Sequence, residues 1–440
     1  MLGYYVDLAV RSLKRSPGLT LLMILAIGFG VAASMTSYSV FRAVSGDPIP
    51  WKSSRLYVPQ IDVWGPKGRI GSNNNEPPEA LDYTDAIALM RDHRAKYQSA
   101  MYRVSPSIVP PDPSLHPINV GGHAVYSEFF PMLDVPFLYG SAWSADNDTQ
   151  RAAVAVISSK LNQKLFAGAN SVGKTLNIDG KDYRVVGVLN NWKPKPVFYD
   201  VVNTGGFTTE QEDIFIPFLR AIAVGMPNDG NTNCSEIPKG SGFVGLQQSS
   251  CVWIAYMAEL DDQAAATAYK DYLDGYARDQ QRAGRFSWAP NNRLRNLPDW
   301  LEAEHVVPSD TKISLLVALG LLIVCLVNTA GLLLAKFLRR SSEIGVRRAL
   351  GVPRLAIYMQ FLTEAGIVGL AGGLLGLVLT WVGVMGVSWV LPKEIASLAH
   401  LDLPLLFITL LVAVIATMLA GLYPTFRASR VQPAWQLKSN

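Results

Sequence analysis

The sequence predicts an integral membrane protein: a four-helix transmembrane bundle with a large α+β domain between the first and second spans. Three observations predict this fold class. Only 17% of the 440 residues are charged, against roughly 25% in ordinary soluble proteins. The apolar residues are concentrated in four uncharged runs, each long enough for the roughly 20 residues that cross a hydrocarbon core. The long segment between the first two runs has the mixed composition of a globular domain.

The first span is predicted at 19–42, after a short N-terminal segment, 1–18. Apolar residues recur in that segment at helical spacing, which is typical of an amphipathic helix on a membrane surface. Basic residues precede the span, so a cleaved signal peptide is an alternative to a permanent anchor. The apolar run is too long for a signal peptide and no small-residue cleavage motif follows it, which favours the anchor.

The other three spans define the topology. They are predicted at 312–335, 366–391 and 403–423. Lysine and arginine gather in the N-terminal segment, the loop 336–365 and the tail 424–440. Because such residues collect on the cytoplasmic side, we expect both termini in the cytoplasm of a bacterium, with the large domain 43–311 and the short loop 392–402 in the periplasm. The net charge of +4 therefore reflects topology and contact with lipid, and nothing supports a nucleic-acid partner.

The large domain is expected to be α+β with two subdomains, because predicted strands and helices alternate along it. The clearest local signal is a pair of strands, 175–178 and 183–188, joined by a tight turn at Asp179-Gly180. A helix is predicted at 262–277. We expect a smaller subdomain at about 141–191, inserted into a domain formed by the segments on either side.

Two of the three cysteines lie in the large domain. Cys234 and Cys251 flank a loop rich in glycine, serine and asparagine, and a disulfide between them would form in an oxidising periplasm. Two free thiols are the alternative, because spacing alone does not establish the geometry of a bridge.

One motif in the large domain matches a nucleotide-binding pattern. Residues 168–175 fit G-x-x-x-x-G-K-[ST]. A working phosphate loop follows a buried strand and opens a helix, but here a predicted helix at 158–166 precedes the motif and the hairpin follows it. We therefore interpret the motif as a turn. The five histidines show no ligand spacing either, so we expect no cofactor, no metal and no catalytic residue in this chain.

The loop between the second and third spans contains a predicted short helix. Ser341 or Ser342 can cap its start. Glu343 suits the positive end of the helix dipole and lies four residues before Arg347, and Gly351 ends the helix. Such a charged helix could push, or be pushed by, a cytoplasmic partner. A helix that lies on anionic lipid is the alternative.

Small residues recur in two of the spans. They are Gly369, Gly372, Gly373 and Gly376 in the third span, and Ala26 and Gly30 in the first. Because small residues let helix backbones approach closely, we expect tight packing within the four-helix unit or across a dimer interface. No acidic or basic residue lies in the middle of a span, which disfavours an ion-coupled carrier.

Several motifs closely resemble those of the FtsX-like, MacB-type permeases of ABC transporters. They are EIGVRRALG at 343–351, QFLTEA at 360–365, GGLLG at 372–376, GLYPTFRASR at 421–430 and, in the large domain, YSEFF at 126–130, VGKT at 172–175 and YRVVGV at 183–188. The resemblance covers nearly the whole chain and is strongest in the last hundred residues.

The resemblance implies a non-catalytic permease subunit that works with an ATP-binding cassette ATPase and a second permease, as a homodimer or a heterodimer. The loop helix would contact the ATPase through Glu343, Arg347 and Arg348, with Gly345 and Gly351 shaping it. The ATPase would bind ATP and Mg²⁺. Because few residues precede the first span, it is expected to be a separate chain.

The family's members also imply the kind of work that this chain does. ATP-driven motion would pass through the first two spans to the periplasmic domain, for export of peptides, antibiotics, toxins or lipoprotein-like substrates, with or without a periplasmic adaptor. The alternative is an FtsX-type relay that controls a periplasmic enzyme and transports nothing. A membrane-anchored enzyme is disfavoured because no catalytic constellation is found.

Overall fold

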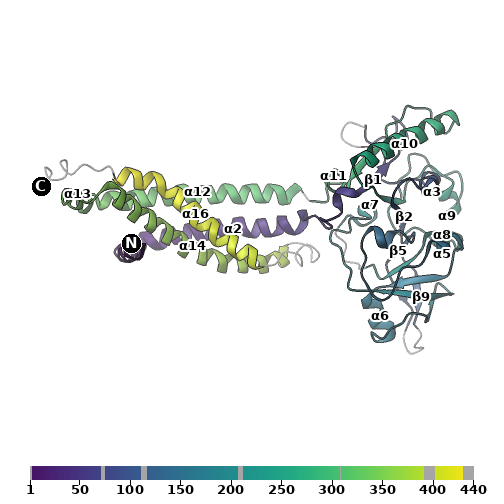
Figure 1. Ribbon diagram of the computed structural model, residues 1–440, viewed down its shortest axis with the longest axis horizontal. Helices are drawn as coiled ribbons and strands as arrows, with labels where there is room; N and C mark the ends of the chain where they lie inside the picture. The colour runs from purple at the N-terminus through teal and green to yellow at the C-terminus, as the bar shows by residue number, and fades with distance from the viewer. Residues whose placement is uncertain are drawn as a thin grey trace. The chain divides into compact units, whose positions relative to one another are not determined.

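The computed structural model describes residues 2–70, 75–110, 116–206, 212–307, 309–390 and 402–429 (Figure 1). The chain forms two compact units. One unit combines Met1–Gly46 with Val307–Asn440 and is a helix bundle, whereas Asp47–Val306 is a mixed α and β domain. The predicted fold class, with one large domain between the first and second spans, is confirmed.

Within the described residues, four helices of the bundle are long and apolar enough to cross a membrane. They are α2 (Pro17–Ser45), α12 (Ser309–Arg339), α14 (Arg354–Val390) and α16 (Leu403–Ser429). All four predicted spans are present, and each helix extends beyond its predicted span at one end or both. The largest extension is in α14, which begins at Arg354 and not at 366.

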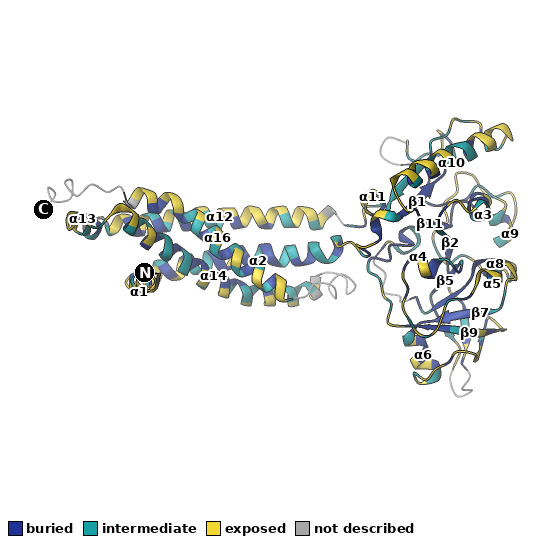
Figure 2. Ribbon diagram, viewed as in Figure 1, coloured by how far each residue is buried: buried dark blue, intermediate teal, exposed yellow. Residues whose placement is uncertain are grey.

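The four long helices are not equally buried. α14 packs against α2 and α16, and α12 packs against α2. The most apolar window of α2 is 50% buried, whereas that of α12 is 17% buried, and Figure 2 shows exposed residues along much of α12. α2 is therefore the most enclosed helix of the bundle, and α12 leaves a long apolar side uncovered.

The N-terminal segment forms α1 (Leu2–Lys14), so the predicted helix is confirmed. It packs mainly on α14, with Ala9 and Ser12 buried and Tyr4 67% exposed. One side of α1 therefore faces protein, and contact of its exposed side with a membrane surface stays a prediction.

The large domain is built on one mixed sheet of twelve strands within the described residues. The order is β12-β1-β11-β2-β5-β10-β7-β9-β8-β3-β4, and β6 pairs with β9. The strands are β1 (Leu56–Gln60), β2 (Tyr97–Val104), β3 (Ser107–Val109), β4 (Ile118–Asn119), β5 (Gly122–Val125), β6 (Phe137–Gly140), β7 (Val154–Ile157), β8 (Thr175–Ile178), β9 (Lys181–Leu189), β10 (Ile214–Pro217), β11 (Ala255–Glu259) and β12 (Arg293–Asn296). Neighbours are antiparallel except for β5 with β10 and β7 with β9.

Short helices connect these strands. They are α3 (Tyr83–Asp92), α4 (Phe129–Met132), α5 (Ala145–Thr149), α6 (Ser159–Phe166), α7 (Val201–Thr204), α8 (Phe218–Ala223), α9 (Gly242–Gln247), α10 (Gln263–Arg282) and α11 (Leu297–Ala303). Ser158 and Asp262 cap the starts of α6 and α10 by accepting a backbone N–H. The two predicted helices are confirmed, and α10 continues past 277.

The two hydrophobic cores of the large domain lie on the two faces of this sheet. Side chains alternate between the faces of a strand, and along β10 Ile214 and Ile216 belong to one core and Phe215 to the other. The segment 141–191 contributes to both cores through β7 and β9. The expected subdomain at about 141–191 therefore has no core of its own, because its strands complete the common sheet.

The predicted hairpin of β8 and β9 is confirmed. The two strands pair antiparallel, with Ile178 opposite Lys181. Asp179 and Gly180 both have positive φ, 49° and 75°, as a two-residue turn of this kind requires.

Candidate functional site

The loop between α12 and α14 folds into α13 (Ser341–Ala349), as predicted. Gly351 follows it with φ +93°, a left-handed conformation that favours glycine after a helix. The predicted serine cap is wrong. Arg340 holds the N-cap position and its side chain caps no backbone group, because the helix begins one residue earlier, almost directly after α12.

One side of α13 is fastened to the bundle by apolar contacts. Ile344, 4% exposed, shares a hydrophobic cluster with Phe337 of α12 and Phe361 of α14. The two phenylalanine rings stack with centroids 4.1 Å apart. Gly345 is buried as well. Burying a side chain of this size stabilises by about 1.5–3 kcal/mol, so α13 is held on the bundle.

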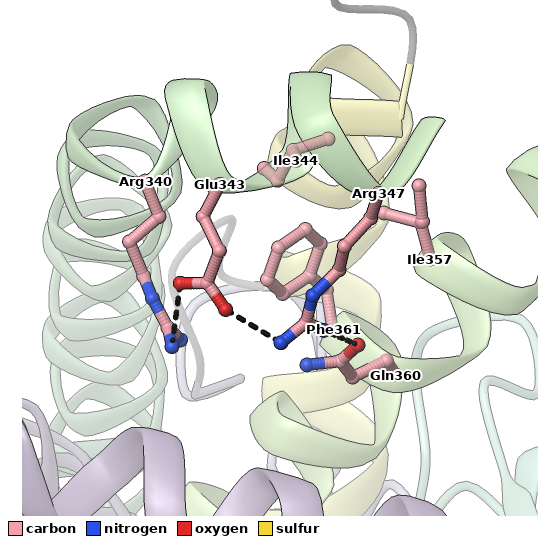
Figure 3. Close-up of a pocket in the computed structure, with 7 residues that line it drawn as sticks. All are labelled: Arg340, Glu343, Ile344, Arg347, Ile357, Gln360 and Phe361. Carbon is pink, nitrogen blue, oxygen red and sulfur yellow. Dashed lines mark hydrogen bonds and ion pairs between the residues drawn. The ribbon is translucent and has the colours of Figure 1, made fainter. Parts of the chain in front are cut away.

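Charged side chains complete this attachment (Figure 3). Glu343 lies between two arginines: its Oε1 is 2.5 Å from Arg347 Nη2 and its Oε2 is 3.2 Å from Arg340 Nη2. Arg347 Nη1 donates to Gln360 Oε1 at 3.2 Å, and Arg15, in the link between α1 and α2, is 3.8 Å from Glu343. The expected pair of Glu343 and Arg347 is thus part of an intramolecular network that joins α13 to α14 and to Arg15 and Arg340, which lie in the links between helices.

The other side of α13, which we name its free side, is exposed in the part of the chain that the structure describes. Val346 is 55% exposed, Leu350 79%, and Leu355, in the first turn of α14, 70%. We name these three residues the apolar tip. Exposed apolar residues grouped at one place mark interaction surfaces when they lie outside a membrane. Arg348 is half-buried.

The hollow between α13 and α14 is small. Its lining consists of Arg340, Glu343, Ile344, Arg347, Ile357, Gln360 and Phe361. Its volume of about 10 Å³ is near the lower limit for one water molecule. Among the described residues, no group of three or more His, Cys, Asp or Glu could hold a metal ion. The arrangement is suited to transmitting force between helices and offers little room for a ligand.

The predicted glycines of α14 pack helices together inside the bundle. The four positions are Gly369, Gly372, Gly373 and Gly376. Gly369 and Gly373 face α16, where a Cβ added at Gly373 would lie 2.9 Å from Ala413 Cβ. Gly372 and Gly376 face α2, where a Cβ added at Gly372 would lie 2.7 Å from Ile27 Cγ2. Of the two expected uses of these residues, close packing within the four-helix unit is the one that the structure contains.

The small residues of α2 behave less uniformly. Gly30 is buried against α12, where an added Cβ would lie 3.1 Å from Cys325 Cβ. Ala26 is only partly buried. Packing of these positions across a dimer interface stays a prediction.

Cys234 and Cys251 are joined by a disulfide, the first of the two alternatives, and Cys325 is free. Next to the bridge, the backbones of Asn233 and Val252 pair. The disulfide therefore closes the loop at the point where its two ends already meet.

The segment that matches a phosphate loop has the predicted surroundings. It lies after α6 and before β8, so the order of elements is the reverse of strand, loop and helix. Gly168 and Gly173 have positive φ, 79° and 88°, as in turns. The secondary structure is thus that of a connecting turn, and the expectation that no nucleotide binds there stays a prediction.

The large domain contains a buried ionic cluster that the sequence did not predict. His123, 0% exposed, has Nε2 2.6 Å from Asp200 Oδ2 and Nδ1 3.1 Å from Glu212 Oε2. Burial by itself lowers the pKa of His123, but Glu212 and Asp200 outweigh it and raise the pKa to about 10. Burial raises the pKa of Glu212, but His123 and Arg103 together outweigh burial, so the pKa is lowered. The carboxylates lie at opposite ring nitrogens, so they hold an imidazolium and do not converge on a metal.

Sequence reasoning also missed polar residues next to α13. Glu364 is 0% exposed and Lys336 3% exposed, and the two form an ion pair. The predicted third span began at 366, which left Glu364 in the loop. Helical spacing was the available signal. Glu364 lies four residues after Gln360 and Lys336 four before Arg340, so each lies one helical turn from a residue of the Glu343 network.

Four helices long and apolar enough to cross a membrane, a large α+β domain between the first two, and a loop helix fastened to the bundle define a class of membrane protein. Two family models support a closer assignment. The MacB-like periplasmic core domain matches residues 20–276, and the FtsX-like permease C-terminal region matches residues 315–433. The chain belongs to the MacB/FtsX-like family of ABC transporter permeases.

Individual relatives are more distant. The pyoverdine export ATP-binding/permease protein PvdT of Pseudomonas syringae pv. syringae is 26% identical over 327 residues, 74% of this chain and 43% of PvdT. The macrolide export ATP-binding/permease protein MacB of Bdellovibrio bacteriovorus is 24% identical over 303 residues, 68% of this chain and 41% of that protein. The chain thus spans less than half the length of these relatives. The periplasmic region of MacB from Actinobacillus actinomycetemcomitans aligns with 12% identity and a TM-score of 0.37, over 59% of this chain and 96% of that one.

Proposed function

We propose that the chain is the permease part of a MacB-like ABC transporter in the bacterial inner membrane. In this proposal both termini and α13 lie in the cytoplasm and the large domain lies in the periplasm. The distribution of basic residues supports this orientation, because lysine and arginine are concentrated in the termini and in the loop that contains α13.

The observation that carries the proposal is the difference between the two sides of α13. Its fastened side contacts α12 and α14 through Ile344 and the Glu343 network, so force applied to α13 reaches both helices. Its free side presents the apolar tip. We propose that an ATP-binding cassette ATPase, which binds ATP and Mg²⁺, docks on the apolar tip and on Arg348.

This proposal changes the roles expected of two residues. The resemblance assigned Glu343 and Arg347 to the ATPase contact, but their charged groups are engaged with each other and with Arg340 and Gln360. We propose that Glu343 and Arg347 brace α13 and that the tip makes most of the contact. Gly345 is a buried residue of α13, and we propose that its lack of a side chain lets α13 lie close to the bundle.

Motion of the ATPase would then pass through α12 and α2 to the large domain. A second permease copy, identical or related, completes the transporter, and the uncovered apolar side of α12 suits lipid or such a copy. The relatives named for pyoverdine and macrolide export support export of a peptide-, antibiotic-, toxin- or lipoprotein-like substrate. Export would proceed with or without a periplasmic adaptor.

The first experiment isolates the full chain from its host in mild detergent and identifies the bound proteins by mass spectrometry. We expect an ATP-binding cassette ATPase in stoichiometric amount. Val346→Asp combined with Leu350→Asp should remove the ATPase while the chain stays inserted and folded. The control is Arg427→Ala, an exposed residue near the end of α16, which should retain the ATPase.

Each other outcome overturns a defined part of the proposal. An ATPase that remains bound and coupled in the double variant would show that docking does not use the apolar tip. Absence of an ATPase from the wild-type sample, even with a non-hydrolysable ATP analogue, would contradict the transporter function. A bound ATPase that no exported compound stimulates would favour a relay that controls a periplasmic enzyme.

A further inference from the structure

A second set of polar contacts lies one helical turn from the Glu343 network. It joins Lys336 of α12, Glu364 of α14 and Ser12 of α1, whose exposures are 3%, 0% and 2%. Lys336 Nζ pairs with Glu364 Oε1. The Ser12 hydroxyl donates to the other carboxylate oxygen, Glu364 Oε2, at 2.7 Å. Both oxygens of this buried carboxylate therefore have a partner.

Ser12 connects this set to the Glu343 network. Arg340 donates through Nη1 to Ser12 Oγ, and through Nη2 it pairs with Glu343 at 3.2 Å. A serine hydroxyl has one hydrogen to donate and two lone pairs to accept. Here the hydrogen is directed at Glu364 and a lone pair accepts from Arg340, so a single atom of α1 links α14 to the start of α13.

The buried ion pair itself adds little to stability. Removing two charges from water costs about as much as their attraction returns, and apolar replacements of such pairs are often neutral or stabilising. What the pair provides is direction. A carboxylate held by Lys336 presents Oε2 at one place, and the serine hydroxyl must lie there to donate.

We propose that α1 is a latch for α13: Glu364, held by Lys336, positions the Ser12 hydroxyl, which positions Arg340 and through it Glu343. α1 ends at Lys14 and α2 begins at Pro17, so the latch gives α13 a connection to the first span that does not pass along α12. The functional role of this connection rests on the proposed use of α13 as the ATPase contact. The latch itself involves residues of the bundle only and can be tested without the ATPase.

The test measures the distance between α1 and α13 in the full chain. Spin labels are placed at Arg11→Cys and Ala349→Cys, both exposed positions, in a Cys325→Ala background that leaves the disulfide intact. Double electron–electron resonance in detergent should give one narrow distance distribution. Ser12→Ala removes the link but leaves the ion pair, and it should broaden the distribution.

The size of the change can be stated. A hydrogen bond to a charged group contributes about 1.5–3 kcal/mol, so the ratio of attached to detached α1 should fall about tenfold or more on this estimate. Ser12→Thr keeps the hydroxyl and should restore the narrow distribution. Lys336→Met with Glu364→Leu replaces the pair by apolar side chains and should broaden it as Ser12→Ala does.

The matched control is Ser34→Ala. Ser34 is a buried serine of α2, 0% exposed, that donates to the Gly30 and Ala318 carbonyl oxygens and to neither α1 nor α13. Its distribution should stay narrow. Unchanged distributions in Ser12→Ala and in the apolar pair variant would overturn the latch.

The same variants separate the latch from the proposed function. In the isolated complex, Ser12→Ala should retain the bound ATPase, keep its basal rate and lose substrate stimulation. If no ATPase co-purifies with the wild-type chain but the spin-label distances respond to Ser12→Ala, the latch is supported and the transporter function is contradicted. Distances that do not respond would contradict the latch even if the ATPase is present.

Discussion

The large domain and the helix bundle bury charged groups in different ways. The large domain buries them at several separate places, including His123 between two carboxylates and Asp82 and Asp85 beside Arg285. In the bundle, among the described residues, Lys336 and Glu364 are the charged residues that are fully buried. We therefore interpret the buried charges of the large domain as stabilising its fold at several places. The buried charges that the structure describes in the bundle lie only in the region next to α13.

Three buried threonines of the bundle illustrate this difference. Thr380, Thr409 and Thr417 each donate to the carbonyl oxygen four residues earlier in their own helix. Such a bond satisfies a hydroxyl without any partner helix, and a helix satisfies its own backbone. The two buried charges of the bundle have their partners on different helices, because Lys336 of α12 pairs with Glu364 of α14.

The largest expected effect would test the scaffolding role of the charges in the large domain. His123→Phe leaves Asp200 and Glu212 buried without their shared cation, and losing one partner of a buried ionic contact costs about 3–5 kcal/mol. We expect hydrogen exchange in β5 and β10 to speed up accordingly in the full chain. His93→Phe is the control, because His93 is 47% exposed beside Glu128 and exposed pairs contribute about 0–1 kcal/mol. Equal effects of the two variants would show that the buried His123 cluster stabilises the large domain no more than the exposed pair of His93 and Glu128 does.

A smaller effect is expected where small residues, not charges, pack the bundle. Gly373→Leu would force a side chain into Ala413 of α16, and overpacking of this kind costs about 1–3 kcal/mol. Gly386→Leu in the same helix is the matched control, since an added Cβ there meets nothing within 4 Å. Thermal unfolding in detergent should separate them, with Gly373→Leu lower. Identical melting temperatures would show that close approach of α14 and α16 does not stabilise the bundle.

The smallest effect is a pH dependence confined to the large domain. The pKa of His123 is about 10 in the folded chain and about 6.5 when unfolded. The stabilising charge is fully present below pH 6.5 and is lost as the pH rises through 10. Between pH 8 and 9 the folded chain holds one more proton, so stability should fall by about 1.4 kcal/mol. The raised pKa of Asp82, about 7, lies below this window.

Hydrogen exchange measured at several pH values between 8 and 9, each corrected for the intrinsic exchange rate at that pH, gives this change of stability with pH. It should appear in β5 and β10 and be absent from α14 and α16. Glu212→Gln removes one of the charges that raise the pKa of His123, so the slope between pH 8 and 9 should become shallower. An unaltered slope would assign the pH dependence to another group.

Features that depend on neighbouring residues were predictable. The β8–β9 turn required residues that accept positive φ, and Asp179-Gly180 supplied them. The spacing of Glu343 and Arg347 predicted their contact within one helix. The predicted cap of α13, Ser341 or Ser342, was wrong, because α13 begins at Ser341, two residues after the end of α12, and Arg340 holds the cap position.

By itself, the sequence determined the four spans, the large domain between the first two, and α13 in the loop, because hydrophobic runs, turn residues and charge spacing act over short distances along the chain. Only the tertiary structure decided that the cores of the large domain lie on two faces of one sheet and that α13 has one fastened and one free side. It also decided that Ser12 meets Glu364, 352 residues later. Such contacts depend on how whole helices pack, which no local pattern specifies.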